Sequence, residues 1–94
     1  MTVKSLFSRA HRWTQRVSQR GSGSAKQYCL VGAIDRVYGN DGESYSRYTA
    51  AVRRVTAAIK VLFPNRTQYS IAAFNDDPNT TLADVRRVVK RARV

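Results

Sequence analysis

The side chains of this chain that could bind or transform a ligand are mostly arginines. The 94 residues include 17 Lys and Arg against 6 Asp and Glu, which gives a formal net charge of +11. The surplus lies in residues 1–27 and 86–94, because both segments contain basic residues and no acidic ones. The candidate binding residues in these segments are Arg9, Arg12, Arg16, Arg20, Arg86, Arg87, Lys90 and Arg91. Such segregation of charge is typical of a surface that binds a polyanion.

Three explanations of this charge map remain open. Non-specific contact with the phosphates of nucleic acid is the one that we expect. A protein with an acidic surface is the alternative partner, because arginine also anchors protein interfaces. An arginine-rich composition imposed by a GC-rich genome would produce the same surplus without any binding function.

Residues that could carry catalysis are scarce. His11 and Cys29 are the single histidine and cysteine, and a working Cys-His pair would need a third group to orient the imidazole. The apolar surroundings of Cys29 predict a buried structural thiol, whereas His11 is expected at the surface. The glycine-serine run at 21–24 follows no predicted strand, so it does not fit a phosphate-binding loop. We therefore expect no enzyme, no catalytic residue and no cofactor.

A group of acidic and amide side chains precedes the predicted last helix. Asn75, Asp76, Asp77 and Asp84 could offer oxygen ligands to Ca²⁺ or Mg²⁺. Their spacing lacks the central glycine and distal glutamate of a calcium-binding loop. Turn formation and capping of the last helix explain the same residues, so we predict no metal site.

Base-specific recognition of DNA is not expected either. The predicted connection at 75–80 is longer than the turn of a helix-turn-helix motif. The first turn of the last helix also offers Leu82, Ala83 and Asp84 where cationic readers of bases would be expected. Any contact with nucleic acid should therefore be independent of sequence.

Apolar periodicity predicts the helices that position the arginines. Residues at helical spacing indicate a first helix that begins near Val3 or Lys4. Its apolar face would consist of Leu6, Ala10, Trp13 and Val17. If this helix continues through Arg20, the arginines of the first segment lie within roughly 80° of one another and form a stripe.

The remaining pattern predicts an all-α fold, a single compact bundle of four to five helices over residues 1–94. The expected elements begin with a flexible linker at 21–27, a helix at 28–38, a turn at 39–42 with Asp41 or Ser44 as the following cap, and a helix at 45–62. They continue with helical turns at 69–74, where a strand is the alternative, a loop at 75–79 and a last helix. Pro64 should stop the long helix, and Thr81 with Asp84 should cap the last one. The second set of cations then lies opposite the apolar face of the last helix.

Short motifs give the chain a resemblance to a known family. They are Trp13-Thr14-Gln15, the helix start Cys29-Leu30-Val31-Gly32-Ala33-Ile34, and Phe74-Asn75-Asp76 followed by Thr80-Thr81 and Asp84-Val85. With these motifs the chain resembles small uncharacterised actinobacterial and actinobacteriophage proteins, in which a tryptophan usually stands in place of Phe74. The resemblance implies a helical fold and a phage or actinobacterial setting, in which an acidic partner would be a host protein. It also favours a break of the first helix near Trp13, which would put Arg16 and Arg20 in a loop.

The expected location is the cytoplasm, or the host cytoplasm for a phage-encoded protein. No unbroken apolar run approaches the length that a membrane span needs, so no membrane partner is expected. Residues 1–10 lack the apolar segment of a secretory signal. The lone Cys29 also fits a reducing compartment.

Overall fold

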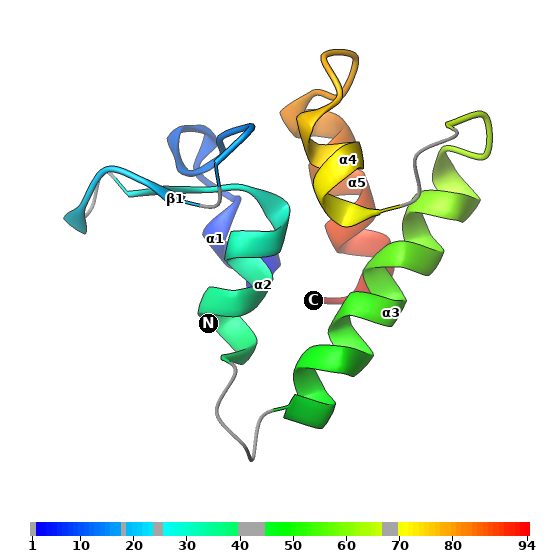
Figure 1. Cartoon of the computed structure of the whole chain (residues 1–94), viewed down its shortest axis with the longest axis horizontal. Coiled ribbons are helices and arrows are strands. Elements are labelled where there is room, and N and C mark those ends of the chain that lie inside the picture. Colours follow the sequence, from blue (N-terminus) through cyan, green and yellow to red (C-terminus); the bar gives the residue numbers. More distant parts are fainter. Residues whose placement is uncertain (1, 18, 24–25, 40–44, 67–69) are drawn as a thin grey trace.

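The computed structural model describes residues 2–17, 19–23, 26–39, 45–66 and 70–94. Its helices are α1 (Val3–Leu6), a 3-10 turn (Ala10–Arg12), α2 (Leu30–Tyr38), α3 (Tyr45–Leu62), α4 (Ile71–Asp76) and α5 (Leu82–Ala92). Two short strands, β1 (Gln19–Arg20) and β2 (Gln27–Tyr28), pair antiparallel. The fold is therefore mostly helical, and the prediction of a strictly all-α fold is corrected by this two-stranded ribbon (Figure 1).

The helices share one apolar core. Helix α5 packs against α3 and α1, and α2 packs against α1, α3 and α4. In Figure 1, α5 descends behind α4, and the ribbon lies on the opposite side of the molecule from α3. The largest fully buried side chains come from all these regions and include Phe7, Leu30, Ile34, Ile59, Phe74 and Val88. Burial of each large apolar side chain contributes about 1.5–3 kcal/mol, so the core fixes how the helices sit.

The first helix is much shorter than the periodicity predicted. Helix α1 ends at Leu6, and Trp13 is already extended, with φ −97° and ψ 140°. The backbone N–H of Thr14 donates to the carbonyl of Tyr28 at 3.0 Å, so from Thr14 onward the chain is bound to β2. The prediction of a continuous stripe of arginines on a first helix is therefore wrong. The chain leaves the helix even earlier than the family resemblance implied.

The following segment was expected to be a linker and then a helix. Gln27 and Tyr28 form β2, and Gly21 and Gly23 connect the strands with positive φ angles of 80° and 57°. Residues 24 and 25 of the expected linker lie outside the described residues. Helix α2 begins only at Leu30 because Cys29 caps it: the Cys29 thiol sulfur accepts a hydrogen bond from the Gly32 N–H at 3.3 Å.

The two longest helices agree with the prediction. Helix α3 ends at Leu62, ahead of Pro64, and the N–H groups of Thr81 and Asp84 each donate to the other residue's side chain at the start of α5. Helix α4 extends through Asp76 and so includes the first two residues of the predicted loop at 75–79. Of the predicted turn at 39–42, only Gly39 is described, and it ends α2 with φ 64°. The rest of this turn, the predicted caps Asp41 and Ser44, and residue 69 lie outside the described residues.

The side chain of Asn75 joins distant segments inside the protein. It is fully buried at the end of α4. Its Oδ1 accepts hydrogen bonds from the Trp13 indole N–H at 2.7 Å and from the Leu30 backbone N–H at 3.0 Å. Its Nδ2 donates to the carbonyl of Thr14 at 3.1 Å. One amide group therefore holds residues 13–14, the start of α2 and the end of α4 together.

Neighbouring residues extend this connection. The Gln15 side-chain amide donates to the carbonyls of Asn75 at 2.9 Å and Asp77 at 3.1 Å. The Arg16 backbone N–H donates to the Asp76 carboxylate at 2.7 Å. Residues 13–16 are therefore bound across the end of α4, and the short motifs at 13–15 and 74–76 contact each other directly.

Replacement of Asn75 by alanine should destabilise the protein strongly. The Trp13 N–H, the Leu30 N–H and the Thr14 carbonyl would lose their partner, and a buried unsatisfied group costs about 1–3 kcal/mol. We expect the free energy of unfolding in urea to fall by about 3 kcal/mol or more. The exposed Asn79 provides a matched control, and Asn79→Ala should change it by less than about 0.5 kcal/mol. Equal effects of the two substitutions would contradict the role given to Asn75.

Candidate functional site

Helix α5 presents most of its cations to solvent. Val85, Val88, Val89 and Ala92 are buried against the core. The cations on its other side are all exposed: Arg86, Arg87, Lys90 and Arg91. Because α5 lies between α1 and α3, these side chains divide into those that face α1, those that face α3 and those that point outward.

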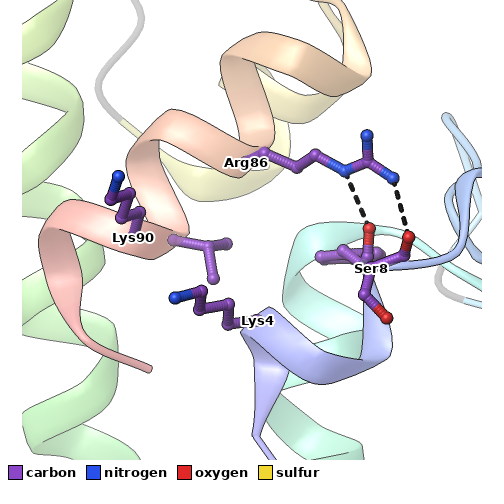
Figure 2. A pocket seen from close by; sticks show the side chains of 6 residues that line it. Lys4, Ser8, Arg86 and Lys90 are labelled. Atoms are coloured by element: carbon purple, nitrogen blue, oxygen red, sulfur yellow. Dashed lines mark hydrogen bonds between the residues drawn. The ribbon is translucent and has the colours of Figure 1, made fainter.

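Arg86 faces α1 and has a structural contact there. Its Nε donates to the carbonyl of Phe7 at 2.9 Å, and its Nη2 donates to the carbonyl of Ser8 at 3.1 Å (Figure 2). The carbonyls at the end of a helix lack partners within the helix, so this guanidinium group caps α1 and fixes it to α5. Arg86 adds charge to the surface, while its Nε and Nη2 each hold a backbone carbonyl.

Arg87 faces the end of α3. Its guanidinium carbon lies 5.4 Å from the centroid of the Phe63 ring. The ring face attracts a cation at this distance, and the contact leaves the charge exposed to solvent. On the same side of α5, Arg54 of α3 donates from Nε to the carbonyl of Ala92 at 3.1 Å and so satisfies the end of α5.

Lys90 and its neighbours form the exposed cationic surface. Lys4 of α1 and Lys90 of α5 are among the residues that line a hollow of about 190 Å³ between these helices (Figure 2). A second hollow brings Lys4, Lys90 and Arg93 together, and a third brings Arg87, Lys90, Arg91 and Arg93 together. Within the described residues, no carboxylate lies within 4.0 Å of the charged groups of these side chains. We call Lys4, Arg87, Lys90, Arg91 and Arg93 the α5 basic surface.

The arginines of the first segment are spread over different elements. The Arg9 side chain is exposed. Arg9 directly follows Ser8, the residue whose carbonyl accepts a hydrogen bond from Arg86. Arg12 donates from Nη1 to the carbonyl of Lys26 at 3.1 Å, so it supports the loop between the strands. Arg16 is exposed with a left-handed backbone, φ 72°, and Arg20 is exposed in β1. Of the cations in residues 1–27, Lys4 is the one that joins the α5 basic surface.

Lys4 and Arg93 were not among the predicted site residues. Both are basic residues of the two segments without acidic residues, so their positive charge could have marked them as candidates. Their positions could not be predicted, because Lys4 reaches α5 only through the packing of α1, and Arg93 ends α5 in a left-handed conformation with φ 59°.

Comparison with known proteins assigns the chain to a family. The model of a family of unknown function, DUF6197, matches residues 4–94. The chain belongs to the DUF6197 family. Neither the curated proteins nor the solved structures contain a match to it. In this DUF6197 chain, no helix of the described part has the length and apolar character that a membrane span requires.

The acidic residues and Cys29 of this DUF6197 protein have structural contacts. Asp77 forms an ion pair with Arg66 at 3.0 Å and accepts the Asn79 N–H at 2.8 Å, which is a turn contact. Asp84 caps α5, and Asp76 accepts the N–H of residue 16. Cys29 is 7% exposed and caps α2, as expected for a structural thiol. The prediction that this cluster serves turns and caps is confirmed for Asp77 and Asp84, whereas Asn75 and Asp76 hold residues 13–16 across the end of α4.

Replacement of Arg86 by lysine should separate its structural role from its charge. Lysine keeps the positive charge but lacks the planar fork that binds both carbonyls. We expect the free energy of unfolding to fall by about 1–2 kcal/mol, with faster hydrogen exchange in α1. Arg91→Lys, made in an exposed arginine on the same helix, should change stability by less than about 0.5 kcal/mol. An Arg86→Lys protein as stable as the Arg91→Lys control would show that the contact with α1 is dispensable.

Proposed function

We propose that this protein is a small basic binding protein without catalytic activity, which contacts the phosphates of nucleic acid through the α5 basic surface. The observation that carries the proposal is the group of exposed cations on α5 and α1 without a carboxylate beside them in the described part of the chain. Mutual repulsion of these charges opposes the compact fold. A row of phosphates would relieve that repulsion and release the counterions of the nucleic acid.

The proposed contact has a centre and two sides. Lys90 lies at the centre, since it borders the hollows on both sides of α5. Lys4 and Arg93 extend the surface toward α1, whereas Arg87 and Arg91 extend it toward α3. Arg86 and Arg12 contribute charge while some of their N–H groups hold backbone carbonyls. The exposed Arg9, Arg16 and Arg20 are proposed as outer contacts for a longer nucleic acid.

Binding is proposed to be independent of base sequence. In helices that read the major groove, the first turn usually supplies the side chains that contact bases. Here that turn offers Leu82 and Ala83, and the Asp84 carboxylate is bound to the cap. The cations lie farther along the helix, where they suit backbone phosphates.

The setting that we propose is that of a phage or actinobacterial accessory protein in the cytoplasm, or in the host cytoplasm for a phage protein. The resemblance through the motifs at 13–15, 29–34 and 74–76 supports this origin, and the arginine-rich composition agrees with a GC-rich genome. An acidic surface of a host protein is the alternative partner for the same cations.

The salt dependence of binding tests the involvement of phosphates. We expect unrelated DNA duplexes to bind with similar affinity in a fluorescence anisotropy titration. Displacement of counterions from about five phosphates predicts a log-log slope near −4.5 against salt concentration. Absence of binding at about 50 mM salt, or affinity that salt leaves unchanged, would rule out the proposed contact with phosphates.

Charge reversal tests which surface binds. The triple change of Lys4, Lys90 and Arg91 to glutamate should weaken duplex binding on the order of 100-fold. It should preserve or raise thermal stability at low salt, because it removes repulsion. The matched control changes Arg36, Arg47 and Arg53, exposed cations on α2 and α3, to glutamate and should weaken binding far less. Equal losses in both proteins would show that net charge, not the α5 basic surface, sets the affinity.

A further inference from the structure

A groove with an apolar floor runs between α3 and α5. It has a volume of about 260 Å³ and is bordered by Arg54, Arg91 and Arg93. Its apolar lining includes Ala57, Ala58 and Val61 of α3. The adjoining hollow at Leu62 and Arg87 shares Arg91 and Arg93 with it, so cations follow the apolar floor along much of the helix pair.

Val61 is the unusual residue of this groove. It is 56% exposed, against 39% for Val17, the other large exposed apolar residue in the described ranges. Ala57 is also exposed and lies one helical turn before Val61, so the two form an apolar ridge on the solvent side of α3. Exposed alanine and valine contribute little to a contact with phosphates, whereas a partner with apolar side chains would bury them.

We propose that this groove docks an acidic amphipathic helix of a partner protein. Apolar side chains of the partner, three or four residues apart, pack on the ridge of Ala57 and Val61. Carboxylates beside them pair with Arg91 and Arg93, which have no carboxylate within 4.0 Å among the described residues. Arg54 adds charge at the rim while its Nε remains on Ala92.

Charge complementarity selects this occupant over a second copy of the chain. A symmetric dimer would place the same arginines against each other across the interface. The repulsion would oppose association, and the net charge of +11 would add to it. A partner helix with acidic residues beside its apolar face would neutralise Arg91 and Arg93 and would cover the exposed Val61.

This inference goes beyond the proposed function because it rests on Ala57 and Val61, which the proposed contact with phosphates does not use. The two surfaces share Arg91 and Arg93, so nucleic acid and the acidic helix should compete. Substitutions at Val61 distinguish the two contacts, because they change the apolar ridge and leave every cation in place.

The probe is a synthetic peptide of about 18 residues with leucines on one helical face and glutamates on the others. A scrambled peptide with the same composition has equal charge without the apolar face. Fluorescence anisotropy should show at least tenfold tighter binding of the ordered peptide. NMR spectra of the full chain should show shifts of the Ala57, Val61 and Arg91 amide signals on its addition.

Val61 variants provide the decisive comparison. Val61→Ser and Val61→Lys should each weaken binding of the ordered peptide about fivefold or more, because the apolar contact is lost. Duplex DNA binding should stay unchanged in Val61→Ser and become equal or tighter in Val61→Lys. Val17→Ser, made in the other exposed valine, should leave the peptide affinity unchanged. Thermal melting checks that the variants fold, as expected for a substitution in an exposed side chain.

The outcomes that overturn the proposal are specific. Equal affinities for ordered and scrambled peptides, or an ordered peptide that is indifferent to Val61→Ser, would mean that charge alone is recognised. An equal loss of DNA and peptide binding in Val61→Ser would make the groove part of a nucleic-acid contact and would also overturn the proposal. If DNA fails to bind while the ordered peptide depends on Val61, the proposed function fails and the docking groove stands.

Discussion

The hydrogen bonds of the buried Asn75 side chain decide the path of the first third of the chain. They bring the Trp13 indole and the Leu30 backbone N–H to the same oxygen, at the end of α4. A buried amide of this kind is stable only when its donors and acceptors are all satisfied, so the surrounding segments have little freedom to shift. The extended path of residues 13–14 follows from this arrangement, and the start of α2, which Cys29 caps, is held beside it. Helices α3 and α5 then complete the core around it.

The cations of α5 divide between support of the fold and exposure to a partner. Arg86 caps α1, and Arg54 caps α5 from the neighbouring helix. Lys90, Arg91 and Arg93 are left exposed on the outer side, next to Lys4. A surface that looks uniform in charge is therefore mixed in role. Its exposed cations support the proposed contact with phosphates, and the valine ridge beside them supports a separate contact with an acidic helix.

Local sequence patterns were sufficient for some elements and not for others. The apolar repeat of residues 45–62 and the Thr81-Asp84 cap predicted α3 and the start of α5, because both depend on residues within a few positions. Residues 6–17 also have a helical repeat of apolar residues. Trp13 and Gln15 are nevertheless extended or irregular, because their side chains form hydrogen bonds to residues about 60 positions away. Charge alone indicated the exposed face of α5. The structural use of Arg86 and the position of Lys4 depend on the packing of α1, which no local pattern contains.

The contact between Arg86 and Phe7 also bears on the order of events during synthesis. The two residues are 79 positions apart, so α1 leaves the ribosome long before its binding surface on α5 exists. At about 5–20 residues per second the delay is about 4–16 s. During that time Val3 and Phe7, both fully buried in the finished protein, lack the cover that α5 later provides. The apolar face of the first segment therefore stays incompletely covered until the last helix emerges, so the final packing of α1 follows synthesis of nearly the whole chain.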